Sequence, residues 1–117
     1  RATRDLNDGS QEDSAGPIQV TIGNGRRSSS FDAFLKPAMA RRNLTVLTEV
    51  LARRVAFAGR KATGVEYEQD GQLRHAKARH VIVSSGAVNS PQLLLLSGIG
   101  PARDLHALGI PVIHDLH

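Results

Sequence analysis

The stretch that decides the fold is His80–Gly100, HVIVSSGAVNSPQLLLLSGIG. Val81–Val83 is a short β-branched run without alternation, which is typical of a strand buried on both faces. Small residues follow, and Gly86 has no Cβ, so its backbone can adopt positive φ or approach a ligand closely. Ser90-Pro91 then predicts the start of a helix that ends at one of the last two glycines of the stretch. A strand, a small-residue turn and a helix N-terminus form the geometry that α/β proteins use to hold nucleotide phosphates.

The same stretch carries a longer pattern of small and apolar residues. It reads Gly86-Ala87-x-x-Ser90-Pro91-x-Leu93-Leu94-x-x-Ser97-Gly98-Ile99-Gly100. This pattern resembles, without a departure, the second signature of the glucose-methanol-choline (GMC) family of FAD-dependent oxidoreductases. Segments 43–48, 62–67 and 108–112 also resemble that family, nearest its choline-dehydrogenase-like alcohol dehydrogenases. The similarity covers most of the chain from about Gly16 onward.

Short strands are predicted between the first third of the chain and the signature. Arg53–Phe57, Gly64–Glu68 and Leu73–Ala78 read as three antiparallel strands, and the Asp70-Gly71 dipeptide favours a hairpin between the last two. Thr45–Thr48 reads as a further buried strand before them. We therefore expect a β-meander that crosses between two adjacent parallel strands, the second being the β-branched run of the signature stretch.

The resemblance implies an α/β fold of Rossmann type with this meander as its crossover. The domain would be an incomplete FAD-binding domain covering residues 30–117. Residues 1–29 would form a polar end followed by a strand and turn from the substrate-side region.

The N-terminal part of the chain has clear turn and cap signals. Residues 1–15 are polar and without apolar period, which predicts a loop. Pro17–Ile22 alternates as a strand does, and Asn24-Gly25 favours a tight turn. Ser29 or Ser30 can cap a helix that begins at Phe31, and Pro37 is expected to break or kink it.

Four residues are candidates for cofactor binding. In the GMC family one residue after the Thr-Val-Leu-Thr phrase bonds the adenine end of FAD through its main chain, and the resemblance places that residue at Ala52. Gly86 and Ala87 are small enough for close approach of the cofactor, and Ser85 adjoins them. The alternatives are that Ala52 is an ordinary strand residue and that Gly86-Ala87 is a tight turn without a ligand.

Composition excludes several classes of site. The 117 residues include no cysteine, which rules out disulfides, thiolate catalysis and cysteine-ligated metals. The five histidines are scattered, so no metal site is predicted. The formal net charge is +4, but aromatic residues are only 3% of the chain, which gives little support for nucleic-acid binding. No apolar run approaches the length of a membrane span.

The resemblance implies oxidation of a small-molecule alcohol, with proton removal by a base and hydride transfer to FAD. The family's Gly-x-Gly-x-x-Gly segment and catalytic histidine are not in this chain, so no residue is assigned a catalytic role and the isolated chain is expected to be inactive. Arg1 is not an initiator methionine, and we expect a piece of a longer protein. Two alternatives stay open: a hydroxynitrile lyase on the same flavin scaffold, and a non-catalytic nucleotide-binding module. We expect a cytoplasmic location, with any membrane association through the electron acceptor.

Overall fold

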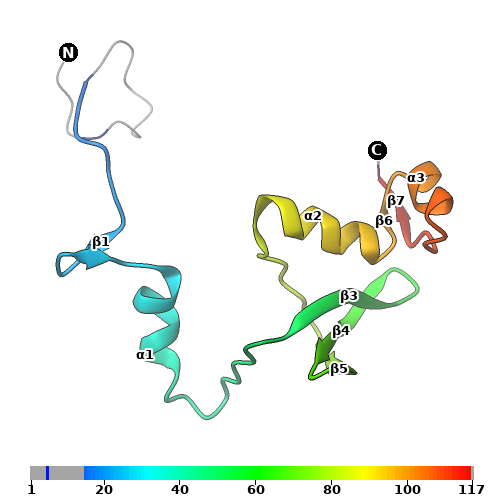
Figure 1. Ribbon diagram of the computed structural model, residues 1–117, viewed down its shortest axis with the longest axis horizontal. Helices are drawn as coiled ribbons and strands as arrows, with labels where there is room; N and C mark the ends of the chain where they lie inside the picture. The colour runs from blue at the N-terminus through cyan, green and yellow to red at the C-terminus, as the bar shows by residue number, and fades with distance from the viewer. Residues whose placement is uncertain (1–4, 6–14, 117) are drawn as a thin grey trace. The chain divides into compact units, whose positions relative to one another are not determined.

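The structure of this chain is a computed structural model that describes residue 5 and residues 15–116 (Figure 1). Its residues divide into two compact units, Arg1–Val46 and Leu47–His117. This boundary between packed units, after Val46, differs from the domain boundary expected after residue 29. The expected domain boundary stays a prediction. The loop expected over residues 1–15 lies almost wholly outside the described residues.

The first unit contains a short hairpin. Strand β1 (Ile22–Gly23) pairs antiparallel with β2 (Arg26–Arg27). Asn24 and Gly25 form the turn with φ of 50° and 70°, and a pair of left-handed residues matches the twist of such a hairpin. The predicted turn is therefore confirmed, whereas the strand expected over Pro17–Ile22 is reduced to its last residue because only Ile22 has a partner in β2.

A helical segment follows the hairpin, and a serine caps it as predicted. The π-helix η1 (Phe31–Leu35) leads directly into the short helix α1 (Lys36–Ala38). The Ser29 hydroxyl accepts a hydrogen bond from the Asp32 amide at 3.2 Å, and the Ser29 amide donates to the Asp32 carboxylate at 3.2 Å. This reciprocal pair is a capping box, with aspartate in place of the usual glutamate. The hydrogen bonds from Ser29 hold the pKa of Asp32 below its ordinary value.

Pro37 is expected to break or kink this helical segment, and α1 ends one residue after it, at Ala38. The proline follows η1 within one continuous segment, so its missing N–H leaves the preceding turn one hydrogen bond short. The helix therefore ends just after the proline and not at it.

The second unit contains the predicted meander. Its strands are β3 (Leu51–Ala58), β4 (Lys61–Gln69) and β5 (Gln72–Lys77), paired antiparallel in the order β3-β4-β5. Asp70 and Gly71 form the tight turn between the last two strands, with φ of 53° and 73°. Strands β3 and β5 are the edges of this sheet, so each has one side without a neighbouring strand in the described chain.

The rest of the second unit is helical, with one small parallel pairing. Helix α2 (Gly86–Leu96) leads into β6 (Ile99–Gly100), helix α3 (Ala102–Ala107) and β7 (His114–Asp115), as Figure 1 shows. Strands β6 and β7 pair parallel, and α3 connects them. Sequence patterns did not predict β6 and β7, because two residues are too few to carry a period.

The start of the signature helix corrects a prediction. The helix begins at Gly86, so Ser90 and Pro91 lie inside its first turns. The Ser90 hydroxyl does not cap the next amides, because it accepts a hydrogen bond from the amide of Ser85 at 2.8 Å. Pro91 cannot donate to the carbonyl four residues earlier, and the helix lacks one hydrogen bond there. Gly98, with φ of 85°, ends the helix as predicted.

Two expected strands do not form, at Thr45–Thr48 and Val81–Val83. A strand buried on both faces needs hydrogen-bonded neighbours along both edges, and no described segment pairs with either run. Ile82 accordingly leaves 89% of its surface exposed. In this structure the meander therefore does not cross between two parallel strands, and no Rossmann-type sheet is formed by the described residues.

The buried apolar core lies in the second unit. It consists of Val55 from β3, Leu93 from α2 and Leu105 from α3. Only the first leucine of the run Leu93–Leu96 is fully buried: Leu94 is half-buried, and Leu95 and Leu96 leave 38% and 46% of their surface exposed. None of the described helices is long and apolar enough to span a membrane.

Candidate functional site

A β-bulge in β3 determines how the first candidate residue is presented. Ala52 pairs with Tyr67 and Arg54 with Glu66, so Arg53 is one residue extra in β3. A bulge of this kind places two consecutive residues opposite one residue of the partner strand. The register of β3 therefore differs on the two sides of Arg53.

Ion pairs on one face of the sheet are consistent with the bulge. Glu66 and Glu68 are two residues apart in β4, so their side chains lie on the same face. Arg53 bonds Glu68, and Arg54 bonds both carboxylate oxygens of Glu66 at 2.7 and 2.9 Å. Neighbouring arginines reach the same face because the bulge interrupts the alternation of side chains. The hydrogen bonds from Arg54 lower the pKa of Glu66, and those to Glu66 raise the pKa of Arg54.

The backbone N–H and C=O groups of Ala52 point away from the neighbouring strand β4. The Val55 amide donates to the Ser97 hydroxyl at 2.8 Å and is therefore directed away from β4. Hydrogen-bonded and non-hydrogen-bonded pairs alternate along an antiparallel ladder, so Arg54 with Glu66 is a bonded pair and Ala52 with Tyr67 is not. It follows that the N–H and C=O of Ala52 are directed to the open edge of β3.

The other three candidate residues form the corner at the start of α2. Ser85 immediately precedes the helix, and Gly86 and Ala87 are its first two residues. All three are exposed. Gly86 has φ of 88°, and a Cβ placed on it would meet no atom within 4 Å. The glycine is thus required by its conformation, while the space in front of it is open.

A groove of about 320 Å³ brings two of the four candidates together. Ala52 contributes from the β3 side and Ser85 from the corner, whereas Gly86 and Ala87 do not line the groove. Its other lining residues come from the segment leading into β3 and from one face of α2: Val50, Leu51, Asn89, Gln92, Leu93 and Leu96. The groove therefore combines apolar side chains with three polar ones, from Ser85 at the corner and from Asn89 and Gln92 along α2.

Asn89 and Gln92 are polar lining residues that were not among the predicted site residues. They lie four and seven residues after Ser85, a spacing that places all three on one face of a helix. This spacing is present in the sequence, but it indicates a common face only if the helix starts at Gly86. A helix that starts at Ser90 would have left Asn89 outside it.

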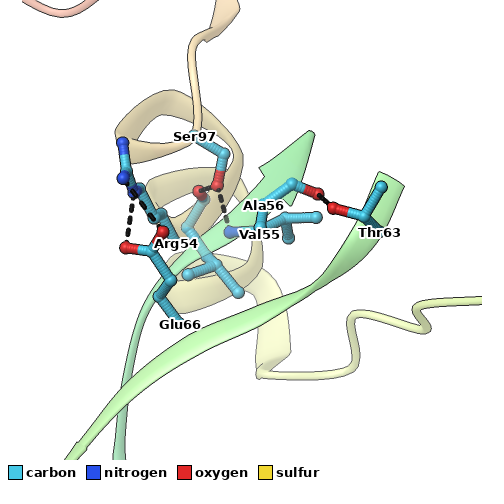
Figure 2. Close-up of polar contacts among 7 residues, drawn as sticks. Arg54, Val55, Ala56, Thr63, Glu66 and Ser97 are labelled. Carbon is cyan, nitrogen blue, oxygen red and sulfur yellow. Dashed lines mark hydrogen bonds and ion pairs between the residues drawn. The ribbon is translucent and has the colours of Figure 1, made fainter. Parts of the chain in front are cut away.

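A buried serine joins the two walls of the groove. Ser97 is 6% exposed, and its hydroxyl accepts the amide hydrogen of Val55 and donates to the Leu93 carbonyl at 2.5 Å (Figure 2). The hydroxyl therefore uses both its donor and its acceptor capacity inside the core. A smaller cavity of about 160 Å³, lined in part by Ser97 and Ile113, lies next to this contact.

No cluster of three or more metal-ligating side chains occurs among residues 5 and 15–116. The hairpin unit has a separate hollow lined mainly by Arg26, Arg27, Lys36 and Ser28. Its cations are exposed, and nothing else about it indicates a ligand.

Comparison with known proteins gives a consistent result. The model of the family described as GMC oxidoreductase matches residues 1–117. Choline dehydrogenase of Homo sapiens mitochondria is 51% identical over 115 residues, which are 97% of this chain and 19% of that protein. Oxygen-dependent choline dehydrogenase of Staphylococcus saprophyticus is 46% identical over 113 residues, 96% of this chain and 20% of that protein. The chain thus spans about a fifth of the length of these relatives.

A solved structure has a similar fold. Pyridoxine 4-oxidase from Mesorbium loti superposes with a TM-score of 0.74 at 35% identity, covering 82% of this chain and 19% of that chain.

Proposed function

Because this chain belongs to the GMC oxidoreductase family, we propose that it forms part of the FAD-binding domain of an oxidoreductase that converts a small-molecule alcohol to an aldehyde. The observation that supports this most directly is the groove in which the main chain of Ala52 and the corner at Ser85 meet. The choline dehydrogenases among its relatives indicate the class of substrate. Residues 30–117 would belong to the FAD-binding domain and residues 1–29 to the substrate-side region.

The groove fits the adenosine end of FAD. Adenine has two apolar faces and an edge of hydrogen-bonding nitrogen atoms. The side chains of Leu93 and Leu96 offer apolar surface, while Ser85, Asn89 and Gln92 offer hydroxyl and amide groups. The volume of about 320 Å³ lies within the roughly 300–1,000 Å³ range of small-molecule sites.

The four candidate residues would have different tasks in binding. The outward N–H and C=O of Ala52 would bond the edge of the adenine, a contact that does not depend on the side chain. Gly86 and Ala87 would let the cofactor approach the backbone of the corner, and Ser85 would lie beside it.

The proposal also accounts for the two segments that do not form strands here, Val81–Val83 and Thr45–Thr48. Both would become parallel strands of a Rossmann-type sheet when strands from the remainder of a longer protein pair with them. The exposed Ile82 would then be buried between the sheet and its covering helices.

FAD, when bound, would accept the hydride released by the alcohol. The residues of this chain would hold and orient the cofactor, and no described residue is assigned to proton transfer. A complete active site would therefore need residues outside this chain.

We expect the full-length protein that carries these residues to purify with one FAD and to reduce a dye in the presence of choline or a related small alcohol. Visible flavin absorbance and a panel of alcohols would measure this. Cyanohydrin cleavage without dye reduction would identify a lyase instead, and bound nucleotide without either activity would identify a binding module. The isolated 117-residue chain is expected to hold FAD weakly or not at all, so stoichiometric flavin in it would contradict that part of the proposal.

Substituting Ala52 tests the main-chain contact. Ala52→Pro removes the outward N–H without removing a ladder hydrogen bond, so the FAD dissociation constant should rise about tenfold. The matched variant Ala52→Val keeps the N–H and should stay within about twofold of the wild type. Equilibrium titration of the apoprotein, with circular dichroism to verify folding, would measure both. Equal affinities of the two variants would show that the amide does not contact FAD.

A further inference from the structure

We propose that Ser97 is a positioning residue for the FAD groove, because its hydroxyl fixes the distance between the two walls. The inference rests on the proposed role of the groove in binding FAD. It assigns a task to a signature residue that lies too deep to touch a ligand in the groove: Ser97 is 6% exposed and is not among the lining residues.

Each hydrogen bond of Ser97 reaches one wall. Val55 lies three residues after Ala52 in β3, and its amide is the donor to Ser97 on the open edge of that strand. Leu93 belongs to α2, and while its carbonyl accepts from Ser97 its side chain lines the groove. One hydroxyl therefore links the strand that presents Ala52 to the helix that presents Ser85, across 42 residues of sequence.

Gly98, which follows Ser97, is held in a tight backbone turn. Gly98 has φ of 85°, and a Cβ on it would lie 2.3 Å from the Pro111 carbonyl oxygen. The chain therefore turns sharply at Gly98 and is held close to the segment at Pro111, directly after the residue whose hydroxyl bonds β3. Alanine at position 97 could neither donate nor accept, and the Val55 amide would be left buried without a partner.

The test uses the full-length protein and begins with the wild type. If the wild type binds no FAD, the proposed function itself fails, whatever the variants do. If it binds FAD, Ser97→Ala should raise the dissociation constant of FAD about tenfold at a temperature at which the apoprotein is folded. Ser97→Thr retains the hydroxyl and should restore most of the affinity.

The control is Ser30→Ala, which removes an exposed hydroxyl that makes no capping hydrogen bond. It should bind FAD within about twofold of the wild type. Where Ser97→Ala does not fold, Ser97→Cys replaces it, since a thiol bonds more weakly and should raise the dissociation constant several-fold. Wild-type affinity in a folded Ser97→Ala or Ser97→Cys variant would overturn the inference. So would equal losses in Ser97→Ala and Ser97→Thr, because the loss would then not depend on whether a hydroxyl is present.

Discussion

Gly98→Ala is expected to lower the free energy of unfolding by roughly 2–5 kcal/mol, because it combines backbone strain with a steric clash. The residue has φ of 85°, which a side chain disfavours, and the added Cβ would lie 2.3 Å from the carbonyl oxygen of Pro111 and 3.0 Å from the Ile113 side chain. Backbone cannot move aside as a flexible side chain can. The Gly98 carbonyl also accepts the amides of Ile113 and His114 at 2.8 and 3.1 Å, so displacement would break the parallel pairing of β6 with β7.

Gly109→Ala is the matched control for this prediction. Gly109 has φ of 69°, but a Cβ there would meet nothing within 4 Å, so only the strain of about 1–2 kcal/mol applies. Hydrogen exchange of the Ile113 and His114 amides in the full-length protein would localise the loss of stability to this region. Equal protection in the two variants would show that the close approach at Gly98 does not matter.

Leu105→Ala should cost about 2–5 kcal/mol, because it opens a cavity in the small core. Leu105 has no exposed surface. Its carbonyl accepts the amide of Ile110 at 2.9 Å, and because alanine keeps this backbone bond, the loss comes from the side chain alone. Few other apolar side chains are buried in the described chain, which leaves little to compensate for the loss.

Leu108→Ala provides the comparison, since Leu108 lies just after the same helix but leaves 73% of its surface exposed. Its stability should stay within about 0.5 kcal/mol of the wild type. Denaturant unfolding of the full-length protein, read through hydrogen exchange in α3, would measure both variants. A small effect at Leu105 would mean that the site collapses around the missing atoms.

Local patterns predicted the elements whose partners lie nearby in sequence. The meander and its turn at Asp70-Gly71 were found because each strand pairs with the next one along the chain. Val81–Val83 failed for the opposite reason: its expected neighbour, Thr45–Thr48, lies on the far side of the meander in the sequence, and the two runs do not pair. The start of α2 was misplaced because serine followed by proline is a common helix start, and the competing hydrogen bond from Ser85 to Ser90 cannot be read from sequence.

The candidate site was predicted only in part. The resemblance to the GMC family supplied Ala52, and the run of small residues supplied Ser85, Gly86 and Ala87. Of these four, Ala52 and Ser85 line the groove, whereas Gly86 and Ala87 do not. Composition and spacing could not show the bulge at Arg53, because any residue can be the extra one in a strand. The buried bridging role of Ser97 likewise depends on a contact between distant segments.

The bulge at Arg53 also bears on how such a site changes during evolution. The direction of the Ala52 N–H and C=O depends on the number of residues between Ala52 and Val55 in β3. One small apolar side chain can therefore replace another at position 52 without changing the backbone groups that a ligand contacts. Gaining or losing a single residue between Ala52 and Val55 would instead exchange inward and outward groups. An insertion or deletion at this place is therefore expected to disturb the site more than a substitution of Ala52 by another small apolar residue.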